Sequence, residues 1–242
     1  MNYDTSFVSQ PGGRKVNEDT CGYQIAPSGG CWVIADGLGG HRGGQSASLL
    51  AVKTVLESLP LMMDNSLNTL HRSLETAQQA IIAGQQSEPE LCAMRTTILL
   101  LVIQNDQARW AHLGDSRLYA FRKNRVVFQT KDHSVPQVLV SAGDIRPEDI
   151  RGHEDRNRLL RSLGNQDDFR PIILENPFQI RSGDAFLLCT DGFWEYVLEN
   201  EMEELLIHSA STVQWLEQME KLLLSRASKN HDNYTAIGIR AI

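Results

Sequence analysis

The sequence predicts an α+β protein in which layers of β-sheet and helix pack against one another. Short β-rich runs follow one another closely in the middle of the chain, and amphipathic helical stripes lie on either side of them. No low-complexity stretch, internal repeat or Pro/Gly/Ser-rich linker divides the 242 residues. We therefore expect one domain spanning 1–242.

Several apolar and β-branched runs have the composition of strands. The run 96–103 is continuously apolar after two threonines, which predicts a strand buried on both faces. Lys123-Asn124 lies between runs 117–121 and 126–129 and predicts a hairpin turn. Because the runs between 96 and 129 have short connections, we expect them to pair antiparallel. Further strands are expected at 21–25, 31–35, 109–113, 185–189 and 234–239.

Apolar residues at three- and four-residue steps predict helices over 44–59 and 65–85, and two more near 202–206 and 213–223. We interpret these stripes as core packing. The segment 142–160 shows neither period and lies in an arginine-rich stretch. Two interpretations of this segment stay open: a solvated insertion, or a flap over a functional site.

The composition excludes several classes of protein. The net charge of −7 has the wrong sign for a nucleic-acid-binding protein, and no basic cluster stands out. The longest aliphatic run, 98–103, has six residues, whereas a membrane helix needs about 20. The first residues lack the pattern of a signal peptide. The four cysteines show no C-x-x-C spacing, so reduced thiols in the cytoplasm are expected.

Acidic residues stand at the boundaries of five expected strands. One such residue alone is typical of a turn. Five would converge if the strands share one end of a sheet. A cluster of carboxylates needs cations, and oxygen ligands favour Mg²⁺ or Mn²⁺. Two such ions are a known arrangement for phosphoryl chemistry, and Arg14 could bind the phosphate. The acidic residues are Glu18 with Asp19, Asp36, Asp115, Asp191 and Asp232.

These residues lie in motifs that resemble those of the metal-dependent protein phosphatases (type 2C, PPM). The stretch from Arg14 to Asp19 resembles R-x-x-N-E-D, and Asp36 to Ser48 resembles D-G-M-G-G-H…G-x-x-A-S. Gly-Asp-Ser-Arg at 114–117 and Lys-Asp-His-Ser at 131–134 also match, as do Thr-Asp-Gly at 190–192 and Asp-Asn-Tyr-Thr at 232–235. The motifs follow the family order over nearly the whole chain, in forms similar to the compact bacterial branch.

The resemblance implies a four-layer αββα sandwich, with two central antiparallel sheets between helices and the metals at one end. It implies that Asp36 bridges two Mn²⁺ or Mg²⁺ ions and that the Gly37 carbonyl joins the second ion. Asp191 and Asp232 would bind the first ion, while Glu18 and Asp19 orient or ligate through waters. Asp115 and Asp191 would help hold a weaker third ion. The segment 142–160 would be the flap that shapes substrate access.

The implied reaction is hydrolysis of phosphoserine or phosphothreonine in proteins by a water that the two ions share. Arg14 would bind the phosphate. The proton for the leaving oxygen could come from His41 or from a metal-bound water, because this chain has Leu38 where animal members carry a histidine. We expect a monomer that acts on phosphoproteins and opposes a bacterial Ser/Thr kinase.

Other phosphatase chemistries do not fit the sequence. No arginine stands six residues after any cysteine, and the chain lacks D-x-D, G-D-x-H and G-x-x-x-x-G-K-[ST]. One alternative from another class stays open, a catalytically inactive phosphatase fold that acts as a regulatory or binding module.

Overall fold

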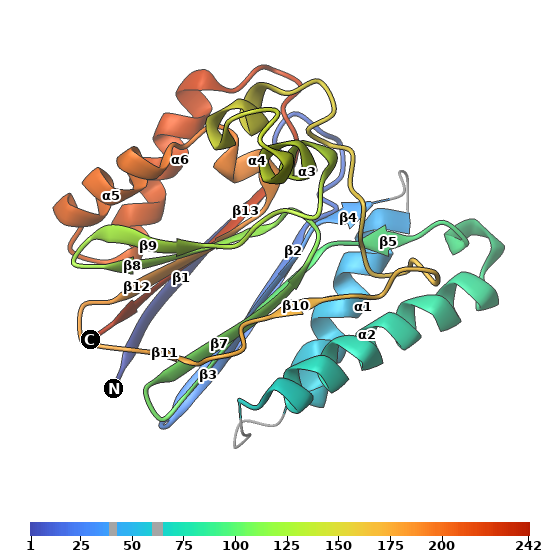
Figure 1. Ribbon diagram of the computed structural model, residues 1–242, viewed down its shortest axis with the longest axis horizontal. Helices are drawn as coiled ribbons and strands as arrows, with labels where there is room; N and C mark the ends of the chain where they lie inside the picture. Colours follow the sequence, from blue (N-terminus) through green and yellow to red (C-terminus); the bar gives the residue numbers. More distant parts are fainter. Residues whose placement is uncertain (39–42, 60–64) are drawn as a thin grey trace.

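Two antiparallel β-sheets pack face to face, and helices cover the outer face of each (Figure 1). The computed structural model describes residues 1–38, 43–59 and 65–242. The predicted α+β class and the four-layer αββα order are confirmed. None of the helices in these ranges is long and apolar enough to cross a membrane.

Each sheet combines strands from distant parts of the chain. The first sheet has the order β1(Tyr3–Gln10), β13(Tyr234–Ala241), β12(Ala185–Cys189), β8(Arg117–Arg122), β9(Arg125–Gln129). The second has the order β10(Ile172–Ile173), β7(Gln107–Leu113), β6(Ile98–Gln104), β3(Gly29–Ala35), β2(Thr20–Ala26), and β11(Phe178–Gln179) also pairs with β7. The short strands β4(Gly37–Leu38) and β5(Arg95–Thr96) pair separately.

Helices α1(Gly43–Ser58) and α2(Leu67–Ser87) cover the second sheet, while α5(Glu199–His208) and α6(Thr212–Arg226) cover the first (Figure 1). They lie close to the ranges that the apolar stripes predict. Four shorter helices complete the described chain: η1(Pro89–Leu91), α3(Val135–Ala142), η2(Pro147–Gly152) and α4(Asp191–Trp194). The segment 142–160 starts at the last residue of α3, contains η2 and a β-bridge from Leu159 to Ser134, and is otherwise turns and irregular chain.

The strand period of two divides the core into three layers. In β6, Leu99 and Leu101 face the layer between the sheets, whereas Leu100 faces α1 and α2. In β12, Phe186 faces the layer between the sheets and Leu187 faces α5 and α6. A strand whose two faces are both buried must be apolar at every position, which accounts for the continuous run at 98–103.

One expected pairing is wrong. Strands β6 and β7 pair, as do β8 and β9, but β7 and β8 belong to different sheets. Between them the chain crosses at Gly114, whose φ is +117°, and a Cβ there would lie 2.6 Å from the Thr97 side chain. The crossing places Asp115 between the two sheets, at the edge where the acidic residues gather.

Candidate active site

The antiparallel order of the strands brings the acidic residues to one edge of the sandwich. In the second sheet, the end of β3 lies beside the start of β2, and the end of β7 lies at the same edge, beside the start of β6. In the first sheet, the end of β12 lies beside the starts of β13 and β8. Each of these strand ends is next to one of the predicted site residues: Asp36, Asp115, Asp19, Asp191 and Asp232.

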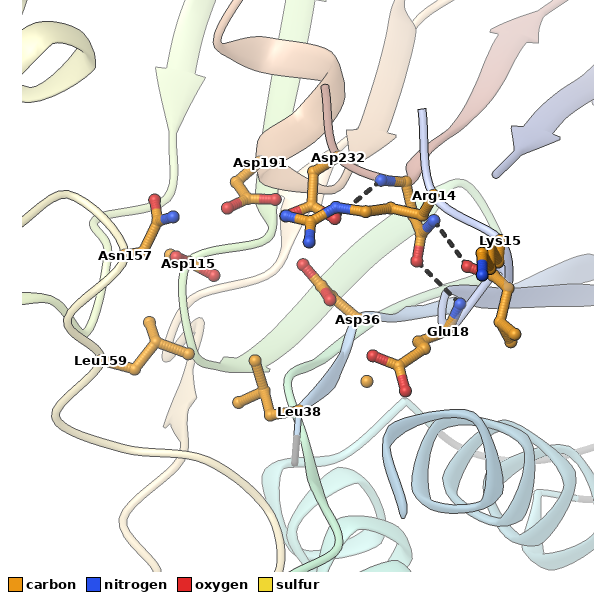
Figure 2. A pocket seen from close by; sticks show the side chains of 13 residues that line it. Arg14, Lys15, Glu18, Asp36, Leu38, Asp115, Asn157, Leu159, Asp191 and Asp232 are labelled. Atoms are coloured by element: carbon orange, nitrogen blue, oxygen red, sulfur yellow. Dashed lines mark hydrogen bonds and ion pairs between the residues drawn. The ribbon is translucent and has the colours of Figure 1, made fainter. Parts of the chain in front are cut away.

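A cavity of about 510 Å³ opens at this edge. Figure 2 shows the carboxylates of Asp36, Asp115, Asp191 and Asp232 directed toward its centre. Arg14 and Lys15 lie on one side of the cavity, and Leu38 and Leu159 on the other. Glu18, Gly37, Asn157 and Asn233 also line it. Asp19 is behind the wall and is only 6% exposed.

Backbone hydrogen bonds hold Asp36 in place. Its N–H donates to Thr97 Oγ1 at 2.9 Å, and its carbonyl oxygen accepts from Thr96 Oγ1 at 2.7 Å and Thr97 N–H at 2.8 Å. These contacts leave the Asp36 carboxylate directed into the cavity. A Cβ on the next residue, Gly37, would lie 2.2 Å from the Gly44 carbonyl oxygen, so only glycine fits there.

The Asn233 amide joins the start of β13 to the segment between β1 and β2 behind the cavity. Its Oδ1 accepts from the Glu18 N–H at 2.8 Å, and its Nδ2 donates to the carbonyl oxygens of Pro11 and Val16. Nearby, Thr190 Oγ1 donates to Asp19 Oδ2 at 2.9 Å. These bonds fix the acidic residues before β2 relative to those at the ends of β12 and β13.

The carboxylates repel one another. Burial raises the pKa of Asp19 to about 7 and that of Asp191 to about 7, and neighbouring carboxylates contribute to both shifts. Burial also raises the pKa of Asp36 and of Asp115 well above the usual range, with Asp191 adding to each. Among the described lining residues, two cations face five carboxylates, so the cavity is arranged for additional positive charge.

The residues present fit divalent metal ions. Asp19 Oδ1 and Asp115 Oδ1 are buried and have no hydrogen-bond partner among the described residues. All the donors are oxygens, which suits Mg²⁺ and Mn²⁺. Within the described ranges, no three His, Cys, Asp or Glu side chains lie close enough together to hold a metal ion by themselves. Ions held here must therefore also use water or backbone oxygens, as Mg²⁺ commonly does.

Comparison with known proteins identifies the family. The model of the family "Protein phosphatase 2C" matches residues 12–231. The chain belongs to the protein phosphatase 2C family. It is 32% identical over 232 residues to the serine/threonine phosphatase stp of Listeria welshimeri, an alignment that covers 93% of this chain and 90% of that protein. The family-specific motifs and the predicted phosphatase activity agree with this result.

Solved structures of phosphatases have the same fold. The serine/threonine phosphatase PstP/Ppp of Mycobacterium tuberculosis superposes with a TM-score of 0.86 at 28% identity, over 99% of this chain and 98% of that one. The catalytic domain of the phosphatase PstP in complex with two manganese ions superposes with a TM-score of 0.84 at 26% identity, over 98% and 97%. This protein is a metal-dependent protein serine/threonine phosphatase of the bacterial type, with Mn²⁺ or Mg²⁺ as its ions.

Arg14 lies at the mouth of the phosphatase cavity, with 55% of its side chain exposed. Its Nη2 donates to Asp232 Oδ2 at 3.0 Å. Because this pair is exposed, it costs little to separate the two side chains. The guanidinium can therefore turn from Asp232 toward an anion in the cavity. Lys15 adds a second cation beside it, which the motif comparison did not single out.

The segment 142–160 contributes Asn157 and Leu159 to the wall of the cavity. Arg156 Nε donates to Glu195 Oε1 at 2.5 Å, and Arg151 Nη2 donates to Glu199 Oε1 at 2.6 Å. Two ion pairs thus hold this segment against the chain that follows Asp191. The sequence did not indicate Asn157, Leu159 or Asn233 as pocket residues, although Asn233 lies inside the Asp-Asn-Tyr-Thr motif at 232–235. His41 lies outside the described residues.

Proposed function

We propose that the carboxylate-lined cavity removes phosphate from phosphoserine and phosphothreonine side chains of proteins, and that residues 1–242 act as one catalytic domain. The observation that carries this proposal is the convergence of buried, mutually repelling carboxylates at strand ends of both sheets. Nothing favours a catalytically inactive module, because every predicted acidic ligand is present at this edge.

In this proposal Asp36 and the Gly37 carbonyl would help hold two ions, together with Asp191 and Asp232. Glu18 and Asp19 would act through water. Asp115 and Asp191 would help hold a weaker third ion. When bound, such ions neutralise the carboxylates and lower the pKa of water.

The chain's own residues bind and orient the phosphorylated side chain. Arg14 leaves Asp232 and donates two hydrogen bonds to phosphate oxygens, where its fixed charge also stabilises the transition state. Lys15 adds charge at the same side of the cavity. Asn157 and Leu159 limit the space beside the phosphate. Two donors remain for the proton that the leaving serine or threonine oxygen takes up, His41 and water.

The experiment is phosphate release by metal-stripped protein, with a phosphothreonine peptide and p-nitrophenyl phosphate as substrates. We expect release only after Mn²⁺ or Mg²⁺ is added. Folded protein that binds metal but releases no phosphate from either substrate would contradict the proposal.

The substrates are phosphoproteins, and we propose that a bacterial Ser/Thr kinase, or the targets of that kinase, supplies them. We also propose that the protein works as a monomer in the cytoplasm. The four cysteines are free, which supports a reducing compartment. Size-exclusion chromatography with light scattering tests the monomer.

A further inference from the structure

A second cavity, of about 340 Å³, adjoins the phosphatase cavity. Leu38 and Leu159 line both cavities and form the wall between them. Figure 2 shows these two leucines on the side of the phosphatase cavity opposite Arg14. A peptide whose phosphorylated side chain enters the first cavity can therefore extend over the leucines toward the second.

Two arginines line this second cavity. Arg95 is exposed and takes part in no ion pair with any described residue. Among the described residues, Arg161 forms an ion pair only with Asp168, at 3.7 Å between Nε and Oδ2, which is too long for a hydrogen bond. No acidic side chain in the described part of the chain lines this cavity, and Ser162 and Asn165 add polar groups. In a chain of net charge −7, this is a local excess of positive charge.

The position of Arg95 is tied to that of Asp36. Arg95 pairs with Leu38 across β4 and β5, and the next residue, Thr96, donates to the Asp36 carbonyl oxygen. On its other side, Thr96 exchanges two backbone hydrogen bonds with Leu163. The strand that carries Arg95 is thus held between the catalytic edge and the segment that carries Arg161.

We infer that this second cavity is a subsite for a negatively charged group on the substrate polypeptide near the phosphorylated residue. The inference rests on the proposed function. Arginine binds carboxylate and phosphate groups with two parallel hydrogen bonds. The group is therefore an Asp or Glu side chain, or a second phosphorylated residue. Because no acidic side chain among the described lining residues neutralises the two arginines, the cavity favours an acidic substrate over a neutral or basic one.

The test uses a series of phosphothreonine peptides with one glutamate placed at each position from four residues before to four residues after the phosphothreonine. We expect one position to raise kcat/KM about threefold to fivefold over the all-neutral peptide, the range of exposed ion pairs. The increase in kcat/KM should come from a lower KM, and it should become smaller as the salt concentration is raised. A second phosphothreonine at that position distinguishes a phosphate-binding subsite from a carboxylate-binding one by which group gives the larger gain.

The variant is Arg95→Gln, and its readout is the ratio of kcat/KM for the acidic peptide to that for the neutral peptide. We expect this ratio to fall toward one, with the remaining preference due to Arg161. Arg72→Gln removes an exposed arginine on α2, away from both cavities, and should keep the wild-type ratio. Equal rates for all peptides, or a preference that Arg95→Gln leaves unchanged, would overturn the inference. Absence of hydrolysis of every peptide and of p-nitrophenyl phosphate would instead contradict the phosphatase function.

Discussion

The indole Nε1–H of Trp194 donates a hydrogen bond to the backbone carbonyl oxygen of Asp115 at 3.0 Å. Trp194 ends α4, whose first residue is Asp191, and Asp115 lies where the chain crosses between the sheets. The Arg117 guanidinium packs over the indole ring, 3.5 Å from its centre. One buried side chain thus fixes two proposed metal ligands relative to each other.

Replacing Trp194 with Phe should therefore weaken metal binding as well as the fold. The change leaves the Asp115 carbonyl without its donor, which costs about 1–3 kcal/mol for a buried group. We expect a lower free energy of unfolding in urea and a larger Kd for Mn²⁺ by calorimetry.

Trp215 provides a matched control. It is also buried, and its Nε1–H donates to the Met202 carbonyl oxygen at 3.0 Å, between α5 and α6. Trp215→Phe should lower stability similarly and leave the Kd for Mn²⁺ unchanged. If both variants shift that Kd equally, Trp194 has no special relation to the metal site.

The ion pair between Arg156 and Glu195 should hold the segment 142–160 in the position in which it contacts substrates. Arg156→Ala removes the hydrogen bond to Glu195, which holds the chain in place directly before the pocket residue Asn157. We expect KM for a phosphopeptide to rise about threefold to tenfold, since a partly buried ion pair contributes on the order of 1 kcal/mol. Steady-state kinetics and limited proteolysis within 142–160 measure the effect.

Arg146→Ala is the control, because Arg146 pairs only with Glu148 and Asp149 of its own turn, among the described residues. That variant should keep the wild-type KM and cleavage pattern. An Arg156→Ala enzyme with wild-type KM and unchanged proteolysis would show that the ion pair does not hold the flap.

Metal binding should strengthen as pH rises from about 5 to about 7. Burial raises the pKa of Asp19 and of Asp191 to about 7, so in the metal-free protein these groups stabilise the fold below their unfolded pKa of about 4. That stability is lost as pH rises through about 7. Ions that bind the ionised form reverse the loss and displace protons.

The measurement is the rise in Tm on adding Mn²⁺, compared at pH 5.5 and 7.5. Burial lowers the pKa of His133 to about 3, so this group makes the metal-free fold more stable as pH rises, opposite to the effect of the carboxylates. Subtracting the metal-free Tm at each pH removes this contribution. We expect the larger rise at pH 7.5. An equal or larger rise at pH 5.5 would contradict the electrostatic account of the cavity.

The convergence of the acidic residues could be predicted from the sequence because it depends on local features. Asp36 and Asp191 each follow a short apolar run, and antiparallel order brings such strand ends together. The crossing between β7 and β8 could not be predicted. It depends on Gly114 packing against Thr97, a contact between distant residues that no periodicity encodes.

The residues that form the walls of the cavity could also not be predicted from the sequence. Asn157 and Leu159 reach it because Arg156 meets Glu195, which lies 39 positions away in the chain. Strand β1 was not predicted because it is an edge strand with polar residues such as Ser6 and Ser9. Helix α3 was not predicted because Val135, Val138 and Val140 give it the composition of a strand.

The most direct test of the central claim compares Asp36→Asn with wild-type protein for Mn²⁺ binding by calorimetry and phosphopeptide hydrolysis on the same preparations. Four neighbouring carboxylates, those of Asp19, Asp191, Asp115 and Asp232, raise the pKa of Asp36, and its replacement removes an oxygen that both ions are proposed to share. The account predicts that metal binding and turnover are lost together. Asp167→Asn, at an exposed site, should behave as wild type. Wild-type turnover by the folded Asp36→Asn protein would contradict the account.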